Sequence, residues 1–167
     1  MSERILPIRD NYALFWGHWP SNWEHSPMVI DGVRYNCVEQ WMMAEKARIF
    51  GDDETLDKIL KTSDPAQQKK LGREVRGFDE AKWVGIRYGV VLCGTLEKYR
   101  QNEHLRDLLL AVPDHITFVE ASPEDKVWGI GMKRDDPRAT DPSQWCGLNL
   151  LGKAITEARS ILRSEYA

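Results

Sequence analysis

The amino-acid sequence predicts an α+β fold, a single and mostly helical domain with a small β-sheet. Met28–Ile30 and Val33–Tyr35 flank an Asp31-Gly32 pair, the signature of a β-hairpin with a type I′ turn. The segment after Asn149 has an apolar stripe typical of a packed helix, made of Leu151, Ile155, Ala158 and Leu162. A length of 167 residues, 42% of them hydrophobic, suits one domain with a substantial core.

The N-terminal segments are expected to form a loop, the hairpin and a first helix. Residues 12–27 are rich in aromatic residues, Pro, Ser, Asn and Gly, and an ordered loop is expected there. Its three indoles require a polar-lined core or a pocket, a small aromatic core being the default; they are Trp16, Trp19 and Trp23. The first helix is predicted from about Val38 to Phe50, with Asn36 as its N-cap and Gly51 as its stop.

Four more helices are expected before the next strand. Residues 53–61 and 64–74 form two short ones, and Asp64-Pro65 gives the second an N-cap and a first-turn proline. A long helix runs from about residue 79 to 99 and a short one from 102 to 112. Three glycines in the long helix indicate close packing of another element against it, namely Gly85, Gly89 and Gly94.

The C-terminal third begins with a buried strand, 116–119, followed by an acidic turn. Residues 122–125 match a capping box, with Ser122 as the cap and Asp125 reaching back to it. A polar loop covers residues 133–146. The last helix is expected to start near Asn149, whose default role is that of an N-cap.

Composition argues against several classes of function. A net charge of −3 provides no basic excess for binding nucleic-acid backbones. Three widely separated cysteines without C-x-x-C spacing indicate reduced thiols, and neither they nor the four histidines predict a metal site. No charged-then-apolar leader and no membrane-length apolar run is present, so a cytoplasmic location without a membrane partner is expected.

Two helical faces carry candidate ligand groups. Glu39 and Lys46 lie two turns apart on one face of the first helix, roughly 10 Å along its axis, where they can bracket a ligand or form a solvated charged face. Glu45 falls on that helix's apolar stripe. Trp83 and Arg87 share a face of the long helix, where Arg87 binds either a phosphate or an internal carboxylate, and Trp83 can stack on a base.

The acidic turn, 120–131, is a third candidate. It carries carboxylates at Glu120 and Asp125 and an indole at Trp128, and backbone N–H groups around Gly129 and Gly131 can bind phosphate oxygens. The Gly-x-Gly follows a turn and lacks a third glycine, so a Rossmann interpretation fails.

Four motifs in order resemble the NADAR (YbiA-like) family over residues 12–163. They are Tyr-Asn-Cys-Val-Glu-Gln-Trp-Met-Met-Ala-Glu-Lys-Ala at 35–47, Phe-Asp-x-x-x-Trp-x-x-x-Arg at 78–87, Glu-Ala-Ser-Pro-x-Asp-x-x-Trp-Gly-Ile-Gly at 120–131, and Trp-x-Gly-Leu-Asn-Leu-Leu-Gly at 145–152. The first motif often carries His-Tyr or Tyr-Tyr where this chain has Gln40-Trp41, so no histidine role carries over.

The resemblance implies an N-glycosidase without an organic cofactor. Family members hydrolyse phosphorylated ribosylamino-pyrimidine intermediates of riboflavin synthesis or remove ADP-ribose from modified guanine, so the expected partner is such a small molecule. The expected catalytic residues are Glu39, Lys46, Glu120 and Asp125. The expected substrate-binding residues are Glu45, Trp83, Arg87, Trp128, Gly129, Gly131 and Asn149.

Two other functions remain open. A non-catalytic module that binds ADP-ribose or a related nucleotide needs the stacking and phosphate groups without the acids, so the acids favour an enzyme. An interaction protein could instead use the Trp-rich loop, 16–23, to bind a partner.

Overall fold

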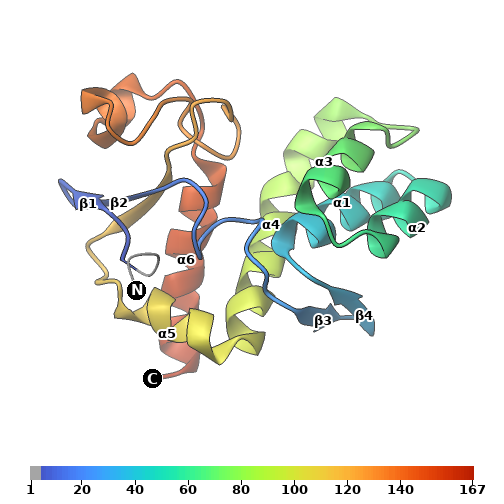
Figure 1. The fold of residues 1–167 in the computed structure, drawn as a ribbon, viewed down its shortest axis with the longest axis horizontal. Helices are drawn as coiled ribbons and strands as arrows, with labels where there is room; N and C mark the ends of the chain where they lie inside the picture. The colour runs from blue at the N-terminus through green and yellow to red at the C-terminus, as the bar shows by residue number, and fades with distance from the viewer. Residues whose placement is uncertain (1–4) are drawn as a thin grey trace. The chain divides into compact units, whose positions relative to one another are not determined.

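A computed structural model describes residues 5–167 of the chain. By its contacts the chain forms two compact units (Figure 1). The helical unit is Asn22–Asn102, and the sheet unit combines the chain up to Ser21 with Glu103–Ala167. The predicted α+β class is confirmed, and the prediction of a single domain over residues 1–167 stays a prediction.

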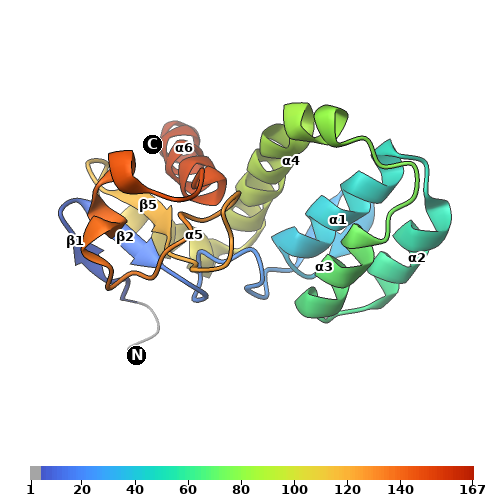
Figure 2. The same ribbon diagram turned by 90° about the horizontal axis from the view of Figure 1, so that it is seen from above.

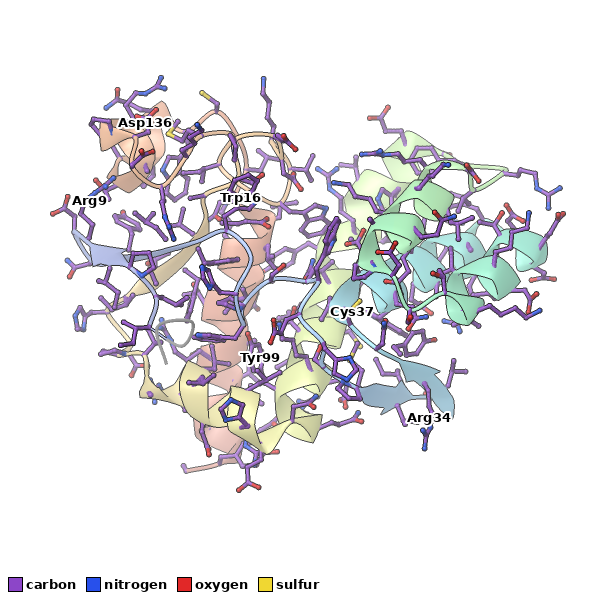
Figure 3. The ribbon with its side chains drawn as sticks, viewed as in Figure 1. Arg9, Trp16, Arg34, Cys37, Tyr99 and Asp136 are labelled. Atoms are coloured by element: carbon purple, nitrogen blue, oxygen red, sulfur yellow. The ribbon has the colours of Figure 1, made fainter. Side chains whose placement is uncertain are left out.

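The helical unit begins with a two-stranded hairpin. Strands β3 (Met28–Ile30) and β4 (Val33–Tyr35) pair antiparallel, as predicted. Positive φ angles at Asp31 (51°) and Gly32 (79°) fit the predicted type I′ turn. Figure 3 shows the side chain of Arg34 pointing outward from β4.

Helix α1 (Val38–Ile49) is the centre of the helical unit. It packs against α2 (Asp53–Lys61), α3 (Pro65–Arg73) and α4 (Glu80–Gln101), and Figure 2 shows it beside α2 and α3. Consequently α1 buries most of its residues, including the polar Glu39 and Gln40. All four helices were predicted within two residues of these bounds.

Two predicted helix details have different outcomes. Asp64 caps α3 by accepting a hydrogen bond from the Ala66 N–H, as predicted. Asn36 as the cap of α1 is wrong, because Cys37 occupies the N-cap position and makes no side-chain capping bond. The Asn36 amide instead donates to the Ser63 carbonyl and accepts from Gln68, tying the hairpin to the α2–α3 connection.

The sheet unit contains a three-stranded sheet in the order β1-β2-β5. β1 (Ile8–Arg9) pairs antiparallel with β2 (Tyr12–Phe15), and β2 pairs parallel with β5 (Thr117–Glu120). β5 confirms the predicted strand with a shift of one residue. The expected loop at 12–27 is wrong over 12–15, because the apolar run Ala13-Leu14-Phe15 pairs with a strand more than a hundred residues away.

Helices α5 (Glu103–Ala111) and α6 (Leu150–Glu165) complete the sheet unit. α6 lies beside β5 in Figures 1 and 2, and its Thr156 hydroxyl accepts the Phe118 N–H at 3.0 Å. The buried Arg159 of α6 donates to the main-chain carbonyls of Pro113, Asp114 and Ile116. These bonds fix α6 against the chain that leads into β5.

The segment after β5 departs from the prediction. No helix follows Ser122, so the predicted capping box is wrong as a helix start. The polar loop contains two short 3₁₀ helices, η2 (Pro137–Thr140) and η3 (Pro142–Gln144). In Figure 3 Arg9 and Asp136 lie in the sheet unit, and Arg9 donates to the Asp136 carbonyl at 2.8 Å, tying β1 to this loop.

Candidate active site

In the helical unit a half-buried lysine lies against two aromatic rings. The Lys46 ammonium lies 4.5 Å from the centre of the Phe78 ring and 5.9 Å from that of Trp83. Phe78 also packs edge-on against Phe50, with ring centres 5.3 Å apart. We call Lys46, Phe78, Trp83 and Glu39 the Lys46 cluster.

The pKa of Lys46 is affected by this burial. Burial lowers the pKa of the Lys46 ammonium, Glu39 opposes the shift, and Arg73 adds to it. Lys46 forms no ion pair with any residue in the part of the chain that the structure describes. An amine with a lowered pKa exists more often in its neutral, nucleophilic form at physiological pH.

Glu39 occupies the first turn of α1 and is 5% exposed. Its own N–H donates to the Asn22 carbonyl, which holds the preceding loop at the start of the helix. A buried carboxylate on the same helix as Lys46 provides an acid–base group and an electrostatic partner for a cation.

Glu45 is engaged elsewhere in the same unit. Its carboxylate accepts from Arg48 at 2.8 Å, and the Arg48 guanidinium lies 5.7 Å from the centre of the Tyr35 ring. Burial raises the pKa of Tyr35, and the hydrogen bond with Arg48 opposes that rise. The structure thus gives Glu45 a structural partner, while its substrate-binding role stays a prediction.

Arg87 and Trp83 come from the first half of α4. Trp83 is buried, and Arg87 is half-buried with its Nε shielded from solvent. Within residues 5–167 that Nε has no hydrogen-bond partner, and Arg87 is in no ion pair. The sequence left open an ion pair between Arg87 and an internal carboxylate. The described residues form no such pair, so the guanidinium is able to bind an anion.

In the sheet unit, Glu120 ends β5 and begins the acidic turn. Its carbonyl accepts from the Ile130 N–H, and its N–H donates to the Asn149 Oδ1 at 3.0 Å. Its carboxylate is half-buried, with Oε2 shielded from solvent. The turn from Glu120 to Ile130 is therefore closed by backbone pairing at its two ends.

Asp125 organises the interior of this turn. Its Oδ1 accepts from the N–H groups of Val127 (2.9 Å) and Trp128 (2.8 Å). It does not reach back to the Ser122 N–H as a capping box requires; instead the Ser122 hydroxyl accepts from Asp125 at 3.1 Å. The carboxylate is therefore oriented by the backbone, with Oδ2 left for other contacts.

Only two backbone N–H groups of this turn are available for the predicted phosphate binding. The N–H groups of residues 124, 125, 127, 128 and 130 already donate hydrogen bonds to side chains or carbonyls of the turn. Gly129 and Gly131 have N–H groups with no acceptor in the described part of the chain. Trp128, half-buried beside them, donates to Asp125 and accepts from the Leu151 N–H through its carbonyl.

Asn149 is not the helix cap that the sequence predicts. It has a φ of 53° and makes no capping bond to α6. Instead its amide accepts from the Glu120 N–H and donates to the Phe118 carbonyl at 3.1 Å. These two bonds form a buried link between β5 and the start of α6, and they hold Asn149 next to the first residue of the acidic turn.

Other features of the structure bear on the remaining predictions. Trp19 is buried, whereas Trp16, labelled in Figure 3, and Trp23 are about half exposed. Among residues 5–167 no three His, Cys, Asp or Glu side chains gather as metal ligands, and no helix has the length and apolarity to cross a membrane.

Phe78 is a site residue that the sequence interpretation missed. The available signal was its position directly before the Asp79 cap of α4 and five residues before Trp83, the N′ and N4 positions of a hydrophobic staple. The role of both rings beside Lys46 depends on the packing of α1 against α4, which no local pattern shows.

Comparisons with known proteins place these features in a family. The model of the NADAR domain matches residues 9–163, which includes both units. The N-glycosidase R617 of Acanthamoeba polyphaga mimivirus is 39% identical over 76% of this chain and 74% of its own length. The riboflavin biosynthesis protein VVA0006 of Vibrio vulnificus is 31% identical over 66% of this chain and 29% of its own length.

A solved structure has the same fold. The NMR structure of Escherichia coli YbiA superposes with a TM-score of 0.77 at 25% identity, covering 96% of this chain and 90% of that one. In sequence the E. coli N-glycosidase YbiA is 27% identical over 93% of this chain and 85% of its own length. The chain is a member of the NADAR family.

Proposed function

We propose that this protein hydrolyses the C1′–N bond of a phosphorylated N-riboside. Its enzyme class is that of hydrolases acting on N-glycosyl bonds, the class named in the mimiviral and E. coli relatives. The observation that carries the proposal is the Lys46 cluster, where an amine with no ion pair among the described residues lies against two aromatic rings, on the same helix as the buried Glu39 carboxylate.

The reaction sets the chemical requirements. Breaking the C1′–N bond builds positive charge on the ribose and negative charge on the leaving base. A carboxylate near C1′ and an acid near the base therefore lower the barrier. The candidates for the first role are Glu120 and Asp125 of the sheet unit, and the candidate for the second role is Glu39 of the helical unit.

Binding groups complete the assignment. The Arg87 Nε is shielded and has no hydrogen-bond partner within residues 5–167, so its guanidinium is suited to phosphate oxygens. The N–H groups of Gly129 and Gly131 are suited to the same ligand atoms. Trp83 and Trp128 supply rings for stacking on a base or a ribose.

Lys46 has two alternative roles. As an ammonium it binds phosphate. As a neutral amine it adds to C1′ of the ring-opened riboside, the base leaves with a proton, and water hydrolyses the resulting imine to free the sugar and regenerate Lys46. Burial lowers the pKa of the Lys46 ammonium, the direction that the second role requires.

Two substrate types fit the proposal, the ribosylamino-pyrimidine phosphates of riboflavin synthesis and ADP-ribosylated guanine. The name of the Vibrio relative favours the first. The test incubates the protein with each and measures released base and sugar by mass spectrometry. Turnover of neither, together with tight calorimetric binding of ADP-ribose, would replace the enzyme by a nucleotide-binding module.

Borohydride trapping distinguishes the roles of Lys46. A reduced adduct on the Lys46 peptide during turnover supports the imine route. Active enzyme that yields no adduct, and that retains turnover as Lys46→Arg, assigns Lys46 to phosphate binding instead.

A further inference from the structure

The carboxylate of Asp52 collects four hydrogen bonds within the helical unit. It accepts from the Thr55 N–H (3.1 Å) and hydroxyl (2.6 Å), and from the Arg76 N–H and guanidinium, both at 2.9 Å. Its side chain is 1% exposed, whereas that of Arg76 is 68% exposed. These bonds hold the pKa of Asp52 well below its usual range, with the Arg76 guanidinium as the largest cause.

Asp52 joins the two segments that form the Lys46 cluster. Its own N–H donates to the Ala47 carbonyl at 2.9 Å, one residue after Lys46 in α1. Its carboxylate holds Arg76, two residues before Phe78. Three residues after Arg76, Asp79 caps α4 through the Lys82 N–H at 3.2 Å.

Phe78 is therefore held between two anchored residues. With Arg76 bound to Asp52 and Asp79 bound to α4, the backbone at Phe78 has little freedom. The ring lies at 4.5 Å from the Lys46 ammonium although Phe78 is 43% exposed. A half-exposed ring needs such backbone anchoring, because core packing alone does not fix it.

We propose that Asp52 and Arg76 form a clip that positions Phe78 over Lys46. Asp52 is thus a positioning residue, which acts on the reactive amine through Phe78 and does not touch the substrate. The proposal rests on the proposed function only in taking Lys46 as the reactive group.

The clip should control how strongly the amine is shielded from water. Burial is the largest cause of the lowered Lys46 pKa, and the charged groups acting on Lys46 are Glu39 of α1 and Arg73 of α3. Neither of these charges belongs to the clip. Releasing Phe78 leaves the two charges in place. It removes shielding, which raises the Lys46 pKa, and it removes the attraction of the ring for the ammonium, which lowers that pKa. Because burial is the largest cause of the lowered pKa, the Lys46 pKa should rise.

The test measures the reactivity of Lys46 without any substrate. The full-length protein is labelled with an amine-acylating reagent from pH 6 to 11, and the Lys46 peptide is quantified by mass spectrometry. Phe78→Ala should label roughly threefold more slowly at pH 8, the change that half a pH unit in pKa produces. Arg76→Ala should shift the profile in the same direction, because it removes the side-chain bond between Arg76 and Asp52 that holds the chain before Phe78. It leaves the Asp52–Thr55 cap of α2 intact, so α2 itself is not disturbed.

Lys61→Ala is the matched control, because it removes an exposed ion pair with Asp57 (2.7 Å) in the same unit. It should leave the Lys46 profile unchanged. If Arg76→Ala and Asp52→Asn lower the melting temperature but leave the profile as in the wild type, Asp52 is merely structural and the proposal fails. A shifted profile in a protein that turns over no N-riboside would support the clip and overturn the proposed function.

Discussion

Asn149 accepts the main-chain N–H of Glu120 through its Oδ1 at 3.0 Å while its own backbone holds a φ of 53°. The backbone of a candidate catalytic residue is thus fixed by a side chain 29 residues later in the sequence. The same amide donates to the Phe118 carbonyl, so both of its polar atoms are used in the core.

Replacing Asn149 should therefore cost stability. Asn149→Ala leaves a buried N–H and a buried carbonyl unpaired and keeps an unfavourable φ, so the free energy of unfolding should fall by about 2–4 kcal/mol. Urea denaturation measures it. Gln144→Ala removes an exposed amide bonded to Asp141 in the same unit and should change stability by less than about 1 kcal/mol. Equal losses in the two variants would contradict the buried link.

Asp125→Asn should separate charge from structure. The amide oxygen can still accept the Val127 and Trp128 N–H groups, so the turn should persist while the negative charge is lost. Turnover should fall roughly 100-fold or more, the order expected for an acid–base group, with an unchanged melting temperature.

Two further variants complete that experiment. Asp125→Ala should lose both activity and stability, because the two N–H groups lose their acceptor. Asp141→Asn changes a carboxylate that caps η3 and has no proposed role, and it should keep wild-type turnover. Near-normal rates in Asp125→Asn would remove Asp125 from the catalytic set.

Glu39→Gln should also lower turnover roughly 100-fold or more if Glu39 is the acid near the leaving base. The neutral amide removes the negative charge that opposes the lowering of the Lys46 pKa, so that pKa should fall further. Turnover and Lys46 labelling are measured on the same preparation. Lost turnover with an unchanged labelling profile would show that Glu39 acts on the substrate alone.

Gly94→Ala should destabilise the helical unit. A Cβ at Gly94 would overlap the Trp41 ring, whose N–H donates to the Val90 carbonyl at 2.8 Å and is thereby fixed against α4. Such overpacking costs about 1–3 kcal/mol. Gly85→Ala and Gly89→Ala meet no described atom within 4 Å and should instead stabilise α4 by about 0.5–1 kcal/mol each. Thermal unfolding of the three variants distinguishes the sites.

Lys98 should make stability rise with pH. Burial lowers the pKa of this fully buried lysine to about 7. Above that pH the folded protein has released the proton while the unfolded lysine keeps it, so the unfolded state binds more protons and the free energy of unfolding increases. The slope approaches about 1.4 kcal/mol per pH unit for one proton.

The measurement compares the wild type and Lys98→Met in urea from pH 7 to 8.5. Above this window Cys37 acts in the opposite direction, because burial raises the pKa of its thiol to about 11 and the folded state keeps that proton longer. Lys98→Met should lack the rising slope, and the exposed Lys61→Met should retain it. A Lys98→Met variant with the wild-type slope would assign the pH dependence to another group.

Much of the helical unit could be predicted because its signals are local. Asp64-Pro65, the Asp31-Gly32 turn and Gly51, with a φ of 71°, act within a few residues of their own positions. β2 was missed for the opposite reason. Its partner β5 is distant in the sequence, and a four-residue apolar run carries no sign of which strand it will meet.

In the acidic turn, too, the sequence identified candidate residues but not the bonds that they make. Sequence alone marked Glu120, Asp125 and Asn149 as candidates, and it assigned two of them capping roles that the structure contradicts. A Ser-x-x-Asp pattern is compatible with both a helix start and a closed turn. The pairing of Glu120 with Ile130 and the Asn149 link decide between them, and both depend on the sheet and α6 being in place.

The sequence by itself determined the α+β class, the order of the helices, the hairpin and the family, because propensity, capping and ordered motifs are properties of short segments. Tertiary structure alone decided which polar groups are still available for a ligand. Asp125 Oδ1 and the Asn149 amide are used by the backbone, whereas Arg87 Nε and the Lys46 ammonium have no described polar partner. A polar group is available for a ligand only if the protein itself has not already paired it. Which donors and acceptors are paired is settled only when the chain folds.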